Sequence, residues 1–247
     1  MSVVMSILAA SMRNDVDQMR LVAQNMASAD VVAYRQHIGV ARPDFASLFG
    51  QENAAAGAAS ALAATGAVHM DVAIDSRPGT LRQTGEPLDV AIQGDGYFVV
   101  STAQGQLLTR RGDFHLDSSG TLSAFSGDPV LGTQGEIRIK GGTPRIEADG
   151  SVLVGGQVIG HLEIAEPAPG GALQPVGDGG LFAASGGQVS VDAGAQVRQG
   201  FLETSNVSPV NQMMTLLQTT HHFEADQRFV RAYDQMLDQA INDLGKV

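Results

Sequence analysis

Residues 5–26 read MSILAASMRNDVDQMRLVAQNM, and the spacing of their apolar side chains predicts a helix with one apolar seam. Methionine recurs every seven residues, and a smaller apolar residue follows each of the first three methionines at the fourth position. Alternating steps of four and three are the period of coiled coils. Gly39, with Arg35 and His37 just before it, would suit the end of this helix. The predicted seam residues are Met5, Met12, Val16, Met19 and Met26.

Residues 201–247 repeat the pattern, with Ser208-Pro209 suited to cap and begin a second helix. The alternate positions of this helix, from Met213 through Gln227 to Ile241, are mostly polar, so the helix is marginal alone and needs a partner. Each helix could pack on the β core of its own chain. The heptad period and the positions at opposite ends of the chain favour pairing with each other, or a bundle shared among subunits. The seam residues of the second helix are Leu216, Phe223, Val230, Leu237 and Leu244.

Glycine is placed unevenly along the chain. Residues 1–38 contain none, residues 39–200 contain 29 of the 30, and residues 201–247 contain one. Glycine is unfavourable inside helices and useful at turns, so the chain divides into helical ends and a turn-rich middle. The predicted parts are an N-terminal helix and turn, an Ala-rich linker or extension, a central β domain, and a C-terminal helix that pairs with the first, over residues 1–38, 39–67, 68–200 and 201–247.

The middle of the chain shows the alternation of β-strands. Between residues 68 and 74, every second residue is apolar, and similar short runs follow. Asp149-Gly150 and Gly155-Gly156 each separate two such runs and are predicted to form two-residue hairpin loops. No helix-length segment is present to connect parallel strands. The predicted fold class is therefore α+β: terminal heptad helices that pair as a coiled coil, with a central all-β region of short antiparallel strands.

Composition excludes several classes of protein. The chain has 247 residues, a formal net charge of -11 and no cysteine. Disulfide scaffolds, thiolate zinc sites, iron–sulfur clusters and a cysteine nucleophile are thus excluded. An excess of acidic residues argues against a nucleic-acid partner. No run of about 18 apolar residues predicts a membrane span. No basic residue precedes Arg13, so a cleaved signal peptide is not expected.

Motifs for catalysis, cofactors or metals are not found. The nearest to a ligand cluster is His221-His222-Phe223-Glu224, in which adjacent helical residues point about 100° apart, so a solvated or interface pair is expected. Gly94-Asp95-Gly96 suggests a phosphate loop, but Val99 stands where a third glycine is needed and a strand follows. The expected protein is not an enzyme and carries no cofactor and no metal.

Three blocks of sequence together resemble the flagellar basal-body rod and hook family of bacterial axial proteins. They cover residues 25–35, 79–122 and 197–207, the last followed by the heptads. The first block departs from the family pattern at Ser28, Val31 and Ala33. Alanine in place of the usual glycine costs about 1 kcal/mol in a left-handed turn, so this turn is expected to differ. The positions that match the family motifs are Asn25, Ala27, Tyr34, Gly85, Pro87, Leu88, Asp89, Gly94, Gly96, Phe98, Arg110, Gly112, Phe114, Gly200, Glu203, Ser205 and Asn206.

The resemblance implies a structural subunit of the basal-body rod that crosses the periplasm. Terminal helices would form the inner coiled-coil layer of a helical tube that transmits torque and lines an export channel. Implied partners are the chain itself, other axial proteins and the flagellar type III export apparatus, which exports such proteins without a cleaved signal. The length is short for the hook protein and suits the proximal rod better than the distal rod, which is the alternative.

Two unrelated functions stay open at the level of sequence. A secreted β-rich enzyme that acts on polysaccharide is supported only by abundant aspartate in the β region, and would be indicated by turnover that one Asp→Asn substitution abolishes. An adhesin or binding module that uses the β face predicts tight binding by the isolated fragment 68–200.

Overall fold

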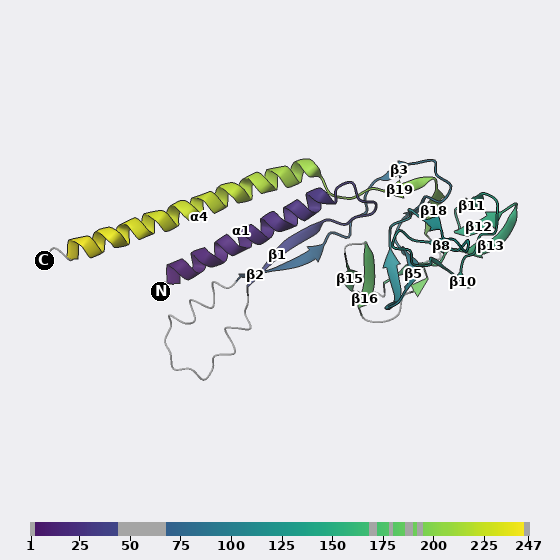
Figure 1. Ribbon diagram of the computed structural model, residues 1–247, viewed down its shortest axis with the longest axis horizontal. Coiled ribbons are helices and arrows are strands. Elements are labelled where there is room, and N and C mark those ends of the chain that lie inside the picture. The colour runs from purple at the N-terminus through teal and green to yellow at the C-terminus, as the bar shows by residue number, and fades with distance from the viewer. Residues whose placement is uncertain are drawn as a thin grey trace, which may run out of the picture. The chain divides into compact units, whose positions relative to one another are not determined.

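The computed structural model describes residues 3–43, 68–167, 172–177, 180–185, 190–191 and 195–244. Two terminal helices and a central region of short antiparallel strands are present, as predicted (Figure 1). The chain forms two compact units. Unit 1 comprises the described residues of Met1–Ala29, Gln36–Asp75 and Val207–Val247, and unit 2 comprises those of Asp30–Arg35 and Ser76–Asn206. Among the described residues, no helix is long and apolar enough to cross a membrane.

Unit 1 contains both helices and a two-stranded ribbon. Helix α1 (Val3–Ala27) lies beside α4 (Pro209–Leu244), and it also contacts β1 (His37–Pro43) and β2 (Val68–Ile74) (Figure 1). The two strands are antiparallel and pair from His37 with Ile74 to Pro43 with Val68. α1 is therefore covered by the second helix and by the ribbon.

The first helix ends earlier than the sequence analysis expects. It stops at Ala27 rather than near Gly39, and residues 39–43 belong to β1. The side chain of Asn25 fixes the first residue of β1 to α1. Its Nδ2 donates to the carbonyl of His37 at 2.8 Å, and its Oδ1 accepts from the backbone N–H of His37 at 2.9 Å. The rest of the expected Ala-rich linker, residues 44–67, lies outside the described residues.

Unit 2 is built from short strands that pair antiparallel throughout its ladders. Its largest sheet has the order β15-β16-β6-β5-β14-β17, and β11-β12-β13 form a second sheet. The strands are β3 (Leu81–Gln83), β4 (Val90–Gln93), β5 (Tyr97–Thr102), β6 (Gly105–Thr109), β7 (His115–Leu116), β8 (Leu122–Ser123), β9 (Leu131–Gly132), β10 (Gly135–Glu136), β11 (Pro144–Ile146), β12 (Ser151–Val154), β13 (Gln157–His161), β14 (Ile164–Glu166), β15 (Ala172–Val176), β16 (Leu181–Ser185), β17 (Ser190–Val191), β18 (Gln196–Gln199) and β19 (Phe201–Glu203).

The hydrophobic cluster of buried residues that the structure describes lies in unit 2. Phe98, Leu122, Val130 and Val152 are completely buried and belong to one apolar cluster. Burial of such side chains stabilises the fold by about 1.5–3 kcal/mol each. The core therefore holds the short strands together, because ladders of two or three residues are not stable alone.

One of the two predicted hairpin loops is longer than expected. Gly155-Gly156 joins β12 to β13 as a two-residue loop, because Val154 pairs with Gln157. The loop at Asp149-Gly150 is longer, since Glu147 N donates to the Ser151 carbonyl and Ile146 pairs with Val152. The Asp149 carboxylate accepts the backbone N–H of Ser151 at 2.9 Å, which stabilises this wider turn.

The last strands of unit 2 return to its first strands. β18 pairs with β4, and β19 pairs with β3, in which Glu203 lies opposite Leu81. This closure brings the third sequence block beside the second, and it positions the side chain of Glu203.

Candidate functional site: a buried arginine–glutamate junction

The three sequence blocks meet at the carboxylate of Glu203 in unit 2. Arg35 Nη2 lies 2.9 Å from Glu203 Oε1, and Arg110 Nη1 lies 3.5 Å from Oε2. Gly79 N donates to Oε1 at 2.9 Å. The Glu203 side chain is 2% exposed, and both arginine side chains are 4% exposed. One buried carboxylate thus connects all three blocks, and we call these four residues the junction.

Backbone hydrogen bonds surround the ion pairs. Ala33 N donates to the Glu203 carbonyl at 2.8 Å, and Asn206 N donates to the Tyr34 carbonyl at 3.3 Å. The Arg35 guanidinium and Asn206 Nδ2 both donate to the carbonyl of Arg77. The segment 33–35 is therefore fixed to the segment 203–206 by main chain as well as by charge.

Ala33 lies in the turn that is expected to differ from the family pattern. It adopts the left-handed backbone conformation. Its φ is 53°, and its side chain is buried. Position 33 thus adopts the left-handed conformation that glycine would favour, although alanine occupies it. A strain of about 1–2 kcal/mol is typical for a non-glycine residue in this region. The hydrogen bond from Ala33 N to Glu203 and the burial of the methyl group offset this strain.

Arg110 has a second set of partners. Its Nη2 donates to the Gly94 carbonyl at 2.7 Å, its Nη1 lies 3.4 Å from the Ile92 carbonyl, and its guanidinium lies 5.0 Å from the Tyr97 ring centroid. Burial lowers the pKa of Arg110, because a charged group loses hydration, while the Glu203 carboxylate acts in the opposite direction. Burial also raises the pKa of Tyr97. Arg110 is therefore buried together with a counter-ion and with two carbonyl acceptors.

Close backbone contacts at two glycines position the blocks around the junction. A Cβ atom on Gly79 would lie 1.9 Å from the carbonyl oxygen of Thr204. A Cβ on Gly112 would lie 1.6 Å from the carbonyl oxygen of Val90. Both clashes are with main chain, so no side-chain rotation could relieve them. Glycine is required at both positions for the segments to approach.

The other predicted motif residues are distributed over unit 2 and α1. Phe98 and Phe114 stack edge to face in the core, with centroids 5.0 Å apart, and Leu88 packs against the same cluster. Pro87 and Asp89 accept hydrogen bonds through their carbonyls, from Gln199 Nε2 and Gly200 N. The remaining residues lie on α1 (Asn25, buried, and Ala27, exposed), in or beside turns of unit 2 (Gly85 and Gly94, exposed, and Gly96, buried), and after β19 (Ser205, half-buried).

In unit 1, the face of α4 that is buried or half-buried follows a heptad pattern. It contains Leu216, Phe223 and Val230 from the predicted seam, whereas Leu237 is exposed and the side chain of Leu244 lies outside the described residues. The predicted second register is covered only in part, because Thr220 and Gln227 are half-buried whereas Met213 and Asp234 are exposed. The positions one residue earlier are buried or half-buried, namely Gln212, Thr219, Asp226 and Tyr233.

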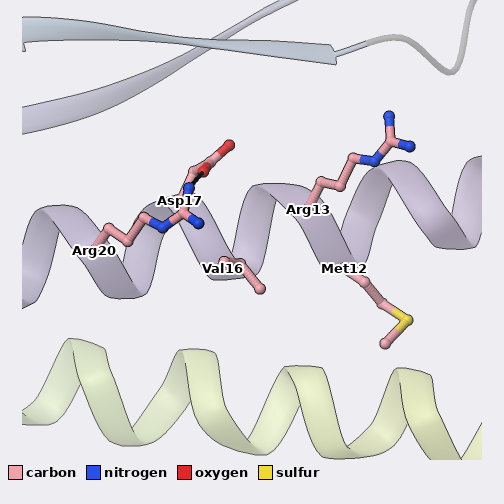
Figure 2. A pocket seen from close by; sticks show the side chains of 5 residues that line it. All are labelled: Met12, Arg13, Val16, Asp17 and Arg20. Atoms are coloured by element: carbon pink, nitrogen blue, oxygen red, sulfur yellow. Dashed lines mark hydrogen bonds and ion pairs between the residues drawn. The ribbon is translucent and has the colours of Figure 1, made fainter.

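The predicted seam residues of α1 are all half-buried, namely Met5, Met12, Val16, Met19 and Met26. Ala9 and Ala23, which continue the predicted spacing, are exposed. Leu8 and Val22, each one residue before these alanines, are half-buried and buried. Figure 2 shows Met12 and Val16 directed toward α4, in a groove of about 400 Å³ that Arg13, Asp17 and Arg20 also line.

The described residues include one group of side chains that could hold a metal ion, made of Asp15, His222 and Asp226 in unit 1. A hydrogen bond to Asp15, 2.8 Å long, is the main reason why the pKa of His222 is raised. His221, the other member of the predicted histidine pair, is exposed and lies 3.9 Å from Glu224.

Arg35, Gly79, Asp15 and Asp226 are important residues that were not selected as site residues from the sequence. Arg35 and Gly79 stand inside the quoted blocks, but nothing in a single sequence distinguishes them from their neighbours. Charged side chains require partners when they are buried, but the sequence does not mark which of the many charges in these blocks are buried.

Comparisons with known proteins match most of the chain. The family model described as "Flagellar basal body rod FlgEFG protein C-terminal" matches residues 198–244, and "Flagellar hook protein FlgE/F/G D1 domain" matches residues 91–154. The "Flagellar basal-body rod protein FlgF" of Mesorhizobium japonicum is 32% identical over 228 residues, which are 91% of this chain and 90% of that protein. FlgF of Rhizobium meliloti is 34% identical over 70% of this chain and 73% of that protein. The "Flagellar basal-body rod protein FlgG" of Bacillus subtilis is 26% identical over 94% of this chain and 96% of that protein.

Proposed function

Because this chain belongs to the family of flagellar basal-body rod and hook proteins, we propose that it is a structural subunit of the flagellar basal-body rod, in the proximal position. The higher identity to relatives named FlgF than to the FlgG of Bacillus subtilis supports the proximal position. The alternative is a distal-rod or other axial subunit. The proposed role is structural rather than catalytic, and its place is the rod that crosses the periplasm.

The junction is the observation that carries this proposal. It fixes the segment before β1 and the segment before α4 to the same buried carboxylate in unit 2. A load applied along either end of the chain would therefore be received by one packed body rather than by flexible linkers. Such a connection suits a subunit that transmits torque, because a buried, hydrogen-bonded charge network is costly to separate.

The terminal helices supply the proposed assembly surface. The heptad spacing of the covered face of α4 supports coiled-coil pairing with α1. A second face of α4 exposes Val210, Met213, Met214 and Leu217, which recur at helical spacing. Contacts of this face with copies of the chain and with other axial proteins would be heterologous, and such contacts build a helical tube when they do not close. That tube would line the export channel, and the subunit would reach it through the type III export apparatus without a cleaved signal.

Leu217 provides the test, because its side chain is 61% exposed in the single chain. Leu217→Asp should leave the thermal unfolding of the purified chain unchanged, but should remove the subunit from isolated basal bodies and abolish swimming. The neighbouring exposed residue gives the matched control, Gln218→Asp, which should assemble normally. A motile strain whose basal bodies contain the Leu217→Asp subunit would refute the proposed surface.

A further inference from the structure

Three potential metal ligands from the two terminal helices converge in unit 1. Asp15 belongs to α1, and His222 and Asp226 belong to α4. His222 Nδ1 lies 2.8 Å from Asp15 Oδ2 and 4.0 Å from Asp226 Oδ2, and the ligand atoms all lie within 4.8 Å of one another. This group is unrelated to the junction and to the exposed face of α4.

We propose that Asp15, His222 and Asp226 form a binding site for a divalent transition metal ion of the zinc class. The inference goes beyond the proposed rod function and does not depend on it. An ion bound there would link the first helix of the chain directly to the last.

The distances fit such an ion after small side-chain rotations. Zinc bonds of about 2.0–2.2 Å place the ligand atoms of a tetrahedral site about 3.4 Å apart. The two distances from His222 Nδ1, 2.8 Å and 4.0 Å, lie on either side of this value. His222 and Asp226 are four residues apart on α4 and therefore share one helix face. Asp15 completes the set from the facing helix.

Burial and charge also favour a cation. The side chains of Asp15 and Asp226 are 15% and 16% exposed. Asp226 Oδ2 is buried and has no hydrogen-bond partner among the described residues, so one acceptor is left unsatisfied. The two carboxylates bring two negative charges together. A dication would neutralise both and would occupy the free lone pair of Asp226.

The donor set selects the class of metal. An imidazole nitrogen with carboxylate oxygens suits zinc, cobalt or nickel, whereas magnesium and calcium prefer oxygen ligands throughout. The side chain of His222 is 59% exposed, so an ion could enter from solvent and a water molecule could serve as the fourth ligand.

Titration of the chelator-treated full chain with Zn²⁺ and with Mg²⁺, by calorimetry, tests the proposal. We expect one Zn²⁺ per chain and no comparable binding of Mg²⁺. His222→Gln and Asp226→Asn should each weaken Zn²⁺ binding at least about tenfold. The matched control is His221→Gln, which removes the adjacent histidine from the same helix but leaves the three proposed ligands in place. It should bind Zn²⁺ like the unaltered chain.

Co²⁺ provides a spectroscopic readout that a loss of helix stability does not imitate. The visible absorption of Co²⁺ bound to the unaltered chain should indicate nitrogen and oxygen ligands, and His222→Gln should lose that spectrum while its far-ultraviolet circular dichroism stays helical. Three results would each overturn the proposal: no Zn²⁺ binding by the unaltered chain, equal affinity in His222→Gln, or an equal loss in His221→Gln.

Discussion

At the scale of single residues, the charge of Glu203 is expected to matter most. Glu203→Gln keeps the size of the side chain but leaves Arg35 and Arg110 buried without a counter-ion. Breaking a buried ion pair costs about 3–5 kcal/mol, so the free energy of unfolding of unit 2 should fall by about this amount. Urea denaturation followed by β-sheet circular dichroism measures it.

The control for this residue is an exposed ion pair in the same unit. Glu136 lies 3.1 Å from Arg138, and both side chains are accessible to water. Exposed pairs contribute about 1 kcal/mol or less, so Glu136→Gln should change the stability little. Similar losses in Glu203→Gln and Glu136→Gln would show that the junction does not have the electrostatic role assigned to it.

At the scale of elements, two turns of unit 2 are closed by an aspartate and a serine two residues later. Hydrogen bonds, chiefly from the Ser119 side chain to Asp117 and from the Ser151 side chain to Asp149, lower the pKa of both carboxyls below the ordinary value of 3.8. The hydrogen bonds stabilise the ionised carboxylates, so the folded pKa is lower than the unfolded one. Their contribution to the stability of the fold is therefore fully present above pH 3.8 and is lost as the pH falls through the lower, folded pKa. The double variant Asp117→Asn, Asp149→Asn cannot be protonated. Its melting temperature should therefore fall less steeply than that of the unaltered chain as the pH is lowered below about 4. Parallel curves would contradict this expectation.

The helix pair gives a second prediction at this scale. Val230 lies on the covered face of α4, and its neighbour Phe229 is exposed. Val230→Asp places an unpaired charge against α1 and should lower the stability of the helix pair by about 2 kcal/mol or more, measured as the thermal loss of helical circular dichroism. Phe229→Asp, one residue away, should have a much smaller effect. If both substitutions destabilise the helices equally, the heptad face is assigned wrongly.

The helices also show what could be predicted from sequence and what could not. The apolar residues Leu216, Phe223 and Val230 marked one register of α4, because their period is visible in the sequence. The other register was located only in part, because Thr220 and Gln227 are half-buried but the more deeply buried positions, Gln212 and Thr219, lie one residue earlier. These residues are polar, so a hydrophobic pattern cannot detect them. Thr219, for example, satisfies its hydroxyl by donating to the Thr215 carbonyl at 2.9 Å, so it can be buried without a partner on another helix.

The β elements have a similar limit. Alternation identified residues 68–74 as a strand, but its partner, residues 37–43, contains Gly39 and Pro43, which are unfavourable in strands. The pairing of β3 with β19 was equally hidden, because residues far apart in the chain form it. The junction depends on that pairing, so the sequence could not show that its residues lie together.

At the scale of the whole molecule, the chain passes between its two units at residues 29–30, 35–36, 75–76 and 206–207. Unit 2 therefore includes a short N-terminal segment, Asp30–Arg35, which is far from the rest of the unit in sequence. The β domain predicted from sequence, residues 68–200, lacks this segment and also lacks β19. It would keep Arg110 but would lose both Arg35 and Glu203.

Two fragments test which boundary describes an independently stable body. Fragment 30–206 retains the whole junction and should fold as a monomer with a cooperative urea transition. Fragment 68–200 should unfold at a clearly lower urea concentration, because Arg110 loses its counter-ion and β3 loses its partner. Introducing Glu203→Gln into fragment 30–206 separates these causes, since it removes the charge but keeps the strand, and it should give a stability between the two. Equal urea midpoints for fragments 30–206 and 68–200 would mean that the junction is dispensable for folding.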